Sequence, residues 1–270
     1  MSDPIGAFGK PGDVLRVIHD VELQALNAAG LYVAQRYGCM ITLGDDPPTF
    51  LGSGTLVQIG EQVFVATARH LFEDLLPDQR ICAWWEPANA KLCVPRSSVI
   101  CGPPDLDVAA IYLGSPADTE AVPLSQVGVG DPGNLTSLMV ISGISSQFTH
   151  PHSPTKTFWA VWWTLGLCPL SRERWPDLQP PPRPHVDLFA YYSNQDALDG
   201  AGRRMPAVPP FGLSGGGVWS VSLTGEGVWN PGALTRLVGI QSSTARGTWS
   251  WLRATRVEEW LKRVRPALSS

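Results

Sequence analysis

The strongest constraint on the fold of this chain is its regular interruption by glycine and proline. The 270 residues include 27 Gly and 25 Pro, which end helices and favour turns. Between these turns lie short apolar segments of strand length at fairly even spacing. This pattern predicts small antiparallel barrels rather than long helices or a parallel sheet.

The predicted strands fall into two sets, separated by a polar connection at residues 114–132. We expect an all-β fold of two packed six-stranded antiparallel β-barrels. The first set is expected at residues 39–43, 50–59, 63–68, 81–85, 92–100 and 108–113, and the second at 135–144, 158–168, 186–192, 218–222, 234–242 and 247–252. Two Pro-containing stretches, 149–156 and 171–184, are expected to be loops.

A helix is predicted near each end of the chain. Residues 13–37 carry apolar side chains at helical spacing, and Gly38 ends the run. Thr255 and Glu258 have the spacing of a capping box, which predicts a helix over 255–264. The expected organisation is a tail and helix at 1–38, a first barrel at 39–120, a second barrel at 121–254 and a C-terminal helix at 255–270.

The composition of the chain limits which binding partners and which cellular location are expected. The formal charge of −4 gives no overall attraction to nucleic acid or to an anionic membrane, so neither is expected as a partner. Residues 1–12 are polar and no apolar run approaches the length of a membrane span, so no signal or anchor is expected. An odd number of cysteines without a C-x-x-C pair favours reduced thiols and a cytoplasmic location. These cysteines are Cys39, Cys82, Cys93, Cys101 and Cys168.

The glycine-rich segment 211–217, with the sequence FGLSGGG, places Ser214 between glycines. Glycine permits positive φ and the close approach of another chain. Such a turn can present a hydroxyl together with backbone N–H groups, as a nucleophile beside an oxyanion hole requires. A hairpin loop with no catalytic role could have the same composition. Whether Ser214 is a nucleophile therefore depends on whether the chain also supplies a base and an orienting acid.

The histidines decide which hydrolase fold could use Ser214. All five of them precede this serine, at positions 19, 70, 150, 152 and 185. The α/β-hydrolase elbow also has a G-x-S-x-G turn, but it requires a histidine after the serine, so that fold is not expected. His70 follows the apolar strand expected at 63–68 and would emerge at a barrel rim, which makes it the candidate base.

An acid that orients the histidine is expected just before another apolar strand. Asp107 opens the strand expected at 108–113, at the edge of the core, where a carboxylate needs hydrogen-bond partners. Such an acid can fix the tautomer of an imidazole. Asp105 is the alternative, although its place in a Pro-Asp-Leu sequence is typical of a turn.

These blocks together resemble a chymotrypsin-fold (trypsin-like) serine peptidase. The sequences GSGTLV at 52–57 and VATARH at 65–70 resemble the G-S-G strand and the T-A-x-H block of that family. DVAAIYL at 107–113 resembles its acid-bearing strand, and GLSGG at 212–216 resembles its G-[DN]-S-G-G turn. LVGIQS at 237–242 resembles the strand that borders the substrate channel. The order His, Asp, Ser is that of the family, and the resemblance runs from about residue 39 to 264.

The resemblance implies a serine endopeptidase that needs no cofactor and no metal. His70, Asp107 and Ser214 would form its catalytic triad, and the N–H groups of Gly212 and Ser214 its oxyanion hole. The implied substrate-binding residues are Val208, Ser242, Ser243 and Thr244. We expect a bacterial intracellular member that makes limited, regulatory cuts in a protein or peptide substrate. A regulatory partner could bind the helix at 13–37 or the Pro-rich loops.

Three departures from the family pattern are informative. Leu213 stands where the family has Asp or Asn; in trypsin zymogens that Asp receives a freed N-terminus, so this chain is not expected to be activated in that way. Pro210 and Leu71 stand where secreted members often have disulfide cysteines. Val208 stands where trypsin-like members hold an acid, so we expect a neutral or apolar substrate side chain rather than Arg or Lys.

Two other functions remain as alternatives. The first is a catalytically inactive peptidase fold that serves as a binding module, because Leu213 could leave the oxyanion turn collapsed. The second is a metal site formed by His150, His152 and His185, for which no fourth His or Cys has a suitable spacing.

Overall fold

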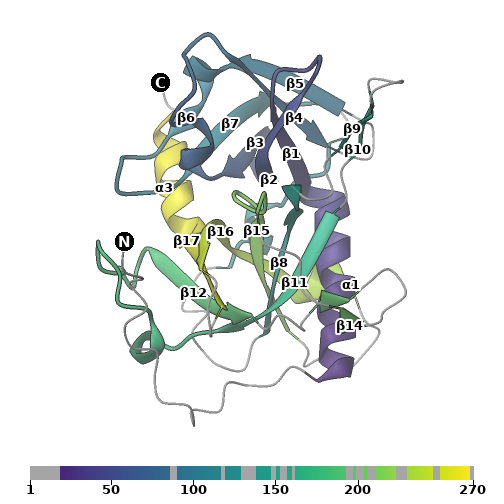
Figure 1. Ribbon diagram of the computed structural model, residues 1–270, viewed down its shortest axis with the longest axis vertical. Coiled ribbons are helices and arrows are strands. Elements are labelled where there is room, and N and C mark those ends of the chain that lie inside the picture. The colour runs from purple at the N-terminus through teal and green to yellow at the C-terminus, as the bar shows by residue number, and fades with distance from the viewer. Residues whose placement is uncertain are drawn as a thin grey trace.

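The computed structural model describes residues 19–85, 90–116, 119–128, 138–146, 150–152, 157–159, 162–192, 197–198, 204–205, 211–222, 230–245 and 250–267. Two antiparallel β-sheets form most of the molecule, together with three α-helices in the described residues (Figure 1). The helices are α1 (Asp20–Tyr37), α2 (Pro231–Leu234) and α3 (Val257–Ala267). The mainly β character and the helices near both ends of the chain agree with the prediction from the sequence.

The second set of strands closes into a six-stranded antiparallel barrel, as predicted. Its strands follow one another around the barrel in the order β11-β12-β17-β16-β15-β8. They are β8 (Leu138–Ile144), β11 (Trp162–Pro169), β12 (Asp187–Tyr192), β15 (Gly217–Val221), β16 (Thr235–Ala245) and β17 (Ser250–Arg256). Short pairs also occur, namely β9 (His150–His152) with β10 (Thr157–Trp159) and β13 (Ala197–Leu198) with β14 (Arg204–Met205).

The first set forms a curled half-barrel of seven strands in the order β5-β4-β1-β2-β3-β7-β6. These are β1 (Gly38–Leu43), β2 (Thr49–Ile59), β3 (Gln62–Thr67), β4 (Arg80–Trp85), β5 (Ala90–Pro95), β6 (Ile100–Cys101) and β7 (Ala109–Gly114). The strand expected over 92–100 is two strands, because Pro95 has no N–H to continue a ladder and residues 96–98 form a 3₁₀ turn. Its halves pair with β4 and β7 at opposite edges of the sheet, so the sheet has to curl.

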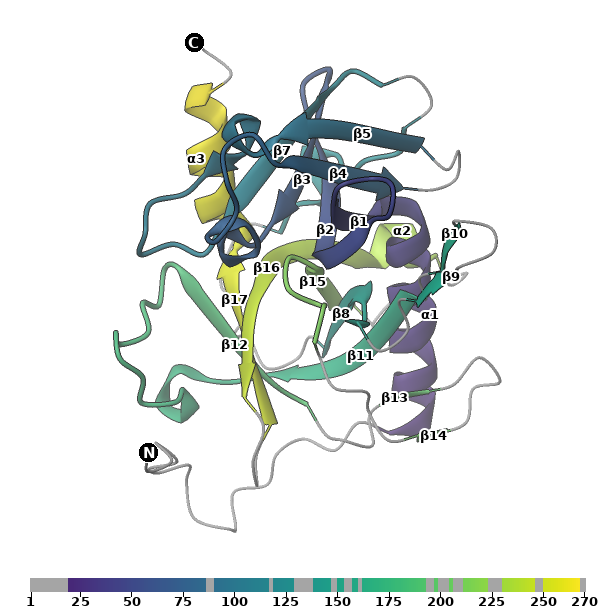
Figure 2. The ribbon, with the colours of Figure 1, turned by 45° about the horizontal axis from the view of Figure 1, so that its top comes forward.

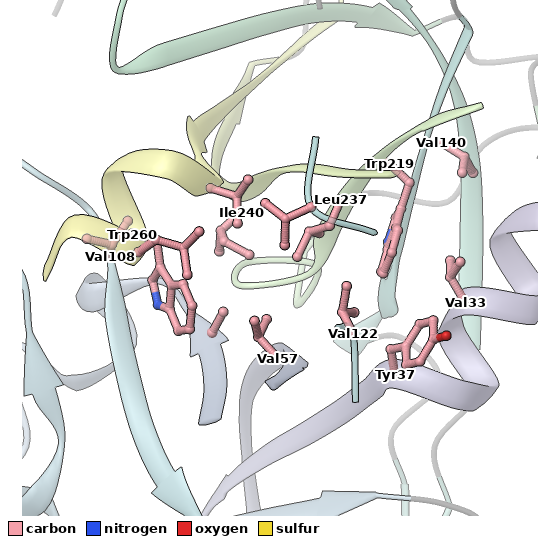
Figure 3. Close-up of a cluster of buried hydrophobic side chains, with 14 of the residues drawn as sticks. Val33, Tyr37, Val57, Val108, Val122, Val140, Trp219, Leu237, Ile240 and Trp260 are labelled. Atoms are coloured by element: carbon pink, nitrogen blue, oxygen red, sulfur yellow. The ribbon is translucent and has the colours of Figure 1, made fainter. Parts of the chain in front are cut away.

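A hydrophobic core lies where the two β units meet (Figure 3). Val57 comes from β2, Trp219 and Leu237 from the barrel, and Trp260 from α3. The connection between the sheets also enters this core through Val122, which exchanges backbone hydrogen bonds with Leu56 and Gln58 of β2. Two further clusters fill the half-barrel and the barrel. The interface between the β units is therefore built from buried apolar side chains, as their interiors are.

Helix α1 packs along the barrel and contributes to the same interface core. It lies beside β8 and β11, on the opposite flank of the molecule from α3 (Figure 2). Its inward residues include Leu26 and Val33, and the ring of Tyr37 at its end stacks on Trp219 with 5.7 Å between centroids. The Tyr37 hydroxyl donates to Gln126 of the connection between the sheets. The apolar face of α1 is thus already buried against the barrel.

Two local expectations are wrong. Thr255 does not cap α3; it lies in β17, paired with Asp187 and Ile240, and the helix begins at Val257. The stretch 149–156 is not only a loop, because β9 and β10 pair as a short hairpin.

The cysteines also differ from the expectation of five free thiols. Cys82 and Cys93 face each other across β4 and β5 and form a disulfide, whereas Cys39, Cys101 and Cys168 are free. Burial raises the pKa of the Cys39 thiol to about 12, so this thiol serves in packing. Among the described residues, no helix is long and apolar enough to cross a membrane.

The burial of one face of α1 predicts that the same Val→Ala substitution has very different effects on stability at two positions of this helix. Val33 is fully buried and Val21 is 78% exposed on the same helix. Val33→Ala should lower the free energy of unfolding by about 2 kcal/mol because buried methyl groups are lost. Val21→Ala should change it by less than about 0.5 kcal/mol. Urea denaturation measures both values, and equal losses would show that α1 does not pack as described.

Candidate functional site

His70 follows the end of β3, in the connection to β4 of the half-barrel. Residues 69–72 form a 3₁₀ turn directly after this strand, and the fully buried Phe72 anchors the turn in the half-barrel core. The His70 ring stays exposed at the rim, with 38% of its side chain accessible. A buried anchor two residues away therefore holds an accessible imidazole in place.

Asp107 is held between two buried neighbours, Leu106 and Val108. Its side chain reaches His70 twice: Oδ2 lies 2.7 Å from Nδ1 of the ring, and Oδ1 accepts the backbone N–H of His70 at 2.9 Å. Since a carboxylate can only accept, Nδ1 carries the proton and the lone pair of the neutral ring lies on Nε2. The carboxylate is half-buried rather than fully buried, with 30% of the side chain exposed.

The environment raises the pKa of His70 above its ordinary value of 6.5. The hydrogen bond that the His70 ring donates to Asp107 is the largest cause, and the negative charges of Asp107 and Glu73 act in the same direction. Partial burial and the charge of Arg69 oppose them. The imidazolium is therefore stabilised, as a base that holds a proton during a reaction requires.

Asp105 has a different partner from Asp107. Its exposed carboxylate accepts from Arg183 at 2.5 Å, and Arg183 also donates to the Asp105 carbonyl. This ion pair lowers the pKa of Asp105. Arg69 donates to the carbonyl of Pro104 in the same loop. Asp105 thus anchors the loop that carries Asp107, and of these two acids only Asp107 contacts His70.

The glycine-rich segment forms a tight turn in front of β15. Gly212 and Gly215 have φ of 90° and 87°, in the left-handed region that favours glycine. Within the turn the Gly216 N–H donates to the Leu213 carbonyl at 2.7 Å. The Gly215 N–H donates to Gln241 of β16, and the Gln241 N–H donates back to Gly216.

The turn docks against the half-barrel close to the His70 segment. The Ser53 N–H of β2 donates to the Ser214 carbonyl at 2.9 Å. A Cβ on Gly52 would meet both that carbonyl and the side chain of Leu71, the residue after His70. Ser214 and the His70 segment therefore flank the same short piece of β2. In the part of the chain that the structure describes, no hydrogen bond joins the Ser214 hydroxyl to His70; such bonds are often long without substrate.

The N–H group of Gly212 faces away from the barrel side of the turn. The Phe211 carbonyl accepts the Ser146 N–H at 2.8 Å, and this carbonyl shares a trans peptide with the Gly212 N–H. The two groups of a trans peptide point in opposite directions. Among the described residues, the N–H groups of Gly212 and Ser214 have no backbone acceptor.

Leu213 is 1% exposed and belongs to the barrel core. Gly143 of β8 makes room for it, since a Cβ there would lie 2.9 Å from the Leu213 side chain. Where the resembled family has a charged or amide side chain, this chain has an apolar anchor.

The structure describes three of the four expected substrate-binding residues. Ser243 and Thr244 lie near the end of β16, and Ser242 is buried with its hydroxyl donating to Arg253. Val208 lies outside the described residues. Sequence reasoning missed the preceding residue Gln241, which is 1% exposed and whose Oε1 accepts no hydrogen bond among the described residues. Such a buried acceptor without a partner is uncommon, and it lies directly beside the glycine turn.

The metal hypothesis stays a prediction. The side chains of His150 and His152 are outside the described part of the chain, and His185 is exposed. In that part, the one group with metal-ligand spacing is Asp45 with Cys82 and Cys93. Its two sulfurs are already joined to each other.

The sequence matches no protein-family model and no curated protein.

The steric crowding of Gly215 can be tested with Gly60 as a matched control. Both have positive φ, but a Cβ on Gly215 would lie 2.1 Å from the Ser53 carbonyl, whereas Gly60 has open space around it. Gly60→Ala should cost about 1–2 kcal/mol of stability through backbone strain alone. Gly215→Ala should cost at least about 2 kcal/mol more, because the turn can no longer dock. Urea denaturation gives the comparison; equal costs would show that the turn does not lie against β2.

Proposed function

We propose that this protein is a serine endopeptidase with a chymotrypsin-like arrangement of two β units. The observation that carries the proposal is the pairing of His70 Nδ1 with Asp107 Oδ2 at 2.7 Å. This pair leaves Nε2 as the basic atom of an exposed imidazole, next to a glycine turn that presents a serine. The barrel and the curled half-barrel are compatible with the double-barrel fold of that family.

The proposed reaction proceeds through an acyl-enzyme. His70 Nε2 removes the proton of the Ser214 hydroxyl as Oγ attacks the carbonyl carbon of a peptide bond. The negative charge that forms on the carbonyl oxygen is stabilised by the N–H groups of Gly212 and Ser214. The tetrahedral intermediate collapses, the C–N bond breaks, and His70 gives its proton to the leaving amine. Water then attacks the ester by the same route and regenerates Ser214.

The substrate would lie along β16 as an added strand, with Ser242, Ser243 and Thr244 at its side. With Val208 in place of an acid, we expect cleavage after neutral or apolar side chains. We also keep the proposals of an intracellular, bacterial enzyme and of limited cleavage of a partner. These proposals rest on the sequence resemblance and its departures. The Cys82–Cys93 disulfide removes the support that the cysteine count gave to a reducing compartment.

An inactive binding module is the second candidate. The lack of a hydrogen bond between Ser214 and His70 in the described contacts favours it. The hydrogen bond between the Phe211 carbonyl and Ser146 weighs against it, because a collapsed turn would aim that carbonyl at the oxyanion position.

Covalent labelling of Ser214 tests the proposal directly. A fluorophosphonate probe should modify the folded protein at one site, which peptide mass spectrometry maps to Ser214. Ser214→Ala should remove the label, while Ser98→Ala, at an exposed serine of the half-barrel, should not. A folded wild-type protein that stays unlabelled would favour the binding module. Cleavage-site profiling of a proteome with wild type against Ser214→Ala would then identify substrates.

The raised pKa of His70 predicts the pH dependence of that labelling. Only the neutral ring can act as a base, so the labelling rate should rise with pH, and the midpoint of this rise should lie above pH 6.5. Asp107→Asn removes the largest cause of the raised pKa, so the midpoint should fall. The plateau should also fall by about 10,000-fold, because Asn can hold the wrong tautomer. Asp105→Asn is the control and should keep the midpoint; a midpoint shift in that variant instead would exchange the roles of the two acids.

A further inference from the structure

Ser53 contacts the glycine turn through both its backbone and its side chain. Its backbone N–H donates to the Ser214 carbonyl at 2.9 Å, and its hydroxyl donates to the Gly212 carbonyl, also at 2.9 Å. The same hydroxyl accepts the Ile144 N–H of β8 at 2.8 Å. The residue is fully buried, so both hydrogen-bonding functions of the hydroxyl are used away from water. One side chain thus ties β2, the turn and the barrel together.

The pattern of fixed peptide planes explains what this contact does. The two proposed oxyanion donors lie on the peptides 211–212 and 213–214. The carbonyls of these peptides are bonded to Ser146 and Gly216. Ser53 holds the two alternate peptides, 212–213 through its hydroxyl and 214–215 through its N–H. The four consecutive carbonyls of residues 211–214 therefore all accept hydrogen bonds. Because each carbonyl shares a rigid peptide plane with the next N–H group, these bonds also fix the orientation of the proposed oxyanion donors.

Other anchors surround the same point. Thr67 of β3 donates its hydroxyl to the Ser53 carbonyl at 2.8 Å, three residues before His70. Leu213 fills the barrel core directly behind the turn, and Gly143 lies within contact of both Leu213 and the Ser53 hydroxyl. The position that holds an acid in the resembled family needs no ionic partner here, because the turn is fixed by packing and by neutral hydrogen bonds.

We propose that Ser53 is a positioning residue that holds the oxyanion turn in its working shape, without a freed N-terminus or an ion pair at position 213. This inference rests on the proposed function for its consequence in catalysis. The contact between the Ser53 hydroxyl and the Gly212 carbonyl carries it. The turn is then formed as soon as the chain folds.

The test compares Ser53→Ala with Ser142→Ala. Ser142 is also buried, and its hydroxyl accepts from Trp219, but it makes no side-chain contact with the turn among the described hydrogen bonds. Fluorophosphonate labelling of Ser53→Ala should slow by about 10- to 100-fold, since loss of a whole oxyanion donor costs about 100- to 1000-fold. Its pH midpoint should stay that of wild type, because the His70–Asp107 pair is intact. Ser142→Ala should label at the wild-type rate.

Amide hydrogen exchange of residues 211–216 gives a second readout that needs no activity. Exchange should be faster in Ser53→Ala than in Ser142→Ala. Equal exchange, or labelling of Ser53→Ala at the wild-type rate, would overturn the role of Ser53. If wild type is not labelled, the peptidase proposal fails, and hydrogen exchange alone decides whether Ser53 holds the turn. Should Ser53→Ala not fold, Ser53→Cys, similar in size but a weak donor, replaces it.

Discussion

The docking of the glycine turn on β2 is the contact on which the whole site depends. The turn belongs to the barrel, whereas His70 and Asp107 belong to the half-barrel. Hydrogen bonds from Ser53 to the Ser214 and Gly212 carbonyls join the two units at this point. Because buried hydrogen bonds of this kind require close and exact alignment, they fix the relative position of the β units where the chemistry is proposed.

The rest of the structure supports this junction. The apolar interface core, with Trp219 from the barrel and Trp260 from α3, provides the non-directional attraction between the units. Helix α1 closes one side of it through Tyr37, and the Trp260 indole donates to the Ala109 carbonyl on the other. Arg183 reaches from the loop before β12 to Asp105 and links the barrel to the loop of the acid. Burial supplies most of the stability, and a few polar contacts set the alignment.

Much of the fold could be read from the chain. The closed barrel, the two terminal helices and most strand positions follow from apolar runs between glycine and proline. The errors have two causes. Strand pairing overrode a local capping pattern at Thr255, which was drawn into β17. The strand expected over 92–100 broke at Pro95, a local signal that the apolar run had masked. The Cys82–Cys93 pair depends on strand register, which spacing along the chain does not reveal.

For the site, the sequence by itself determined the candidate groups and their order: a serine in a glycine turn, a histidine after a strand and an acid before another. These are local features, and local chemistry makes them visible. The tertiary structure added the contact between His70 and Asp107, the acid preferred from the sequence, and it alone showed that Leu213 is an apolar anchor. It also revealed Ser53, whose neighbours Gly212 and Ile144 lie far away in the chain. Such contacts form only when two sheets pack, because they join backbone groups that carry no signal in the sequence.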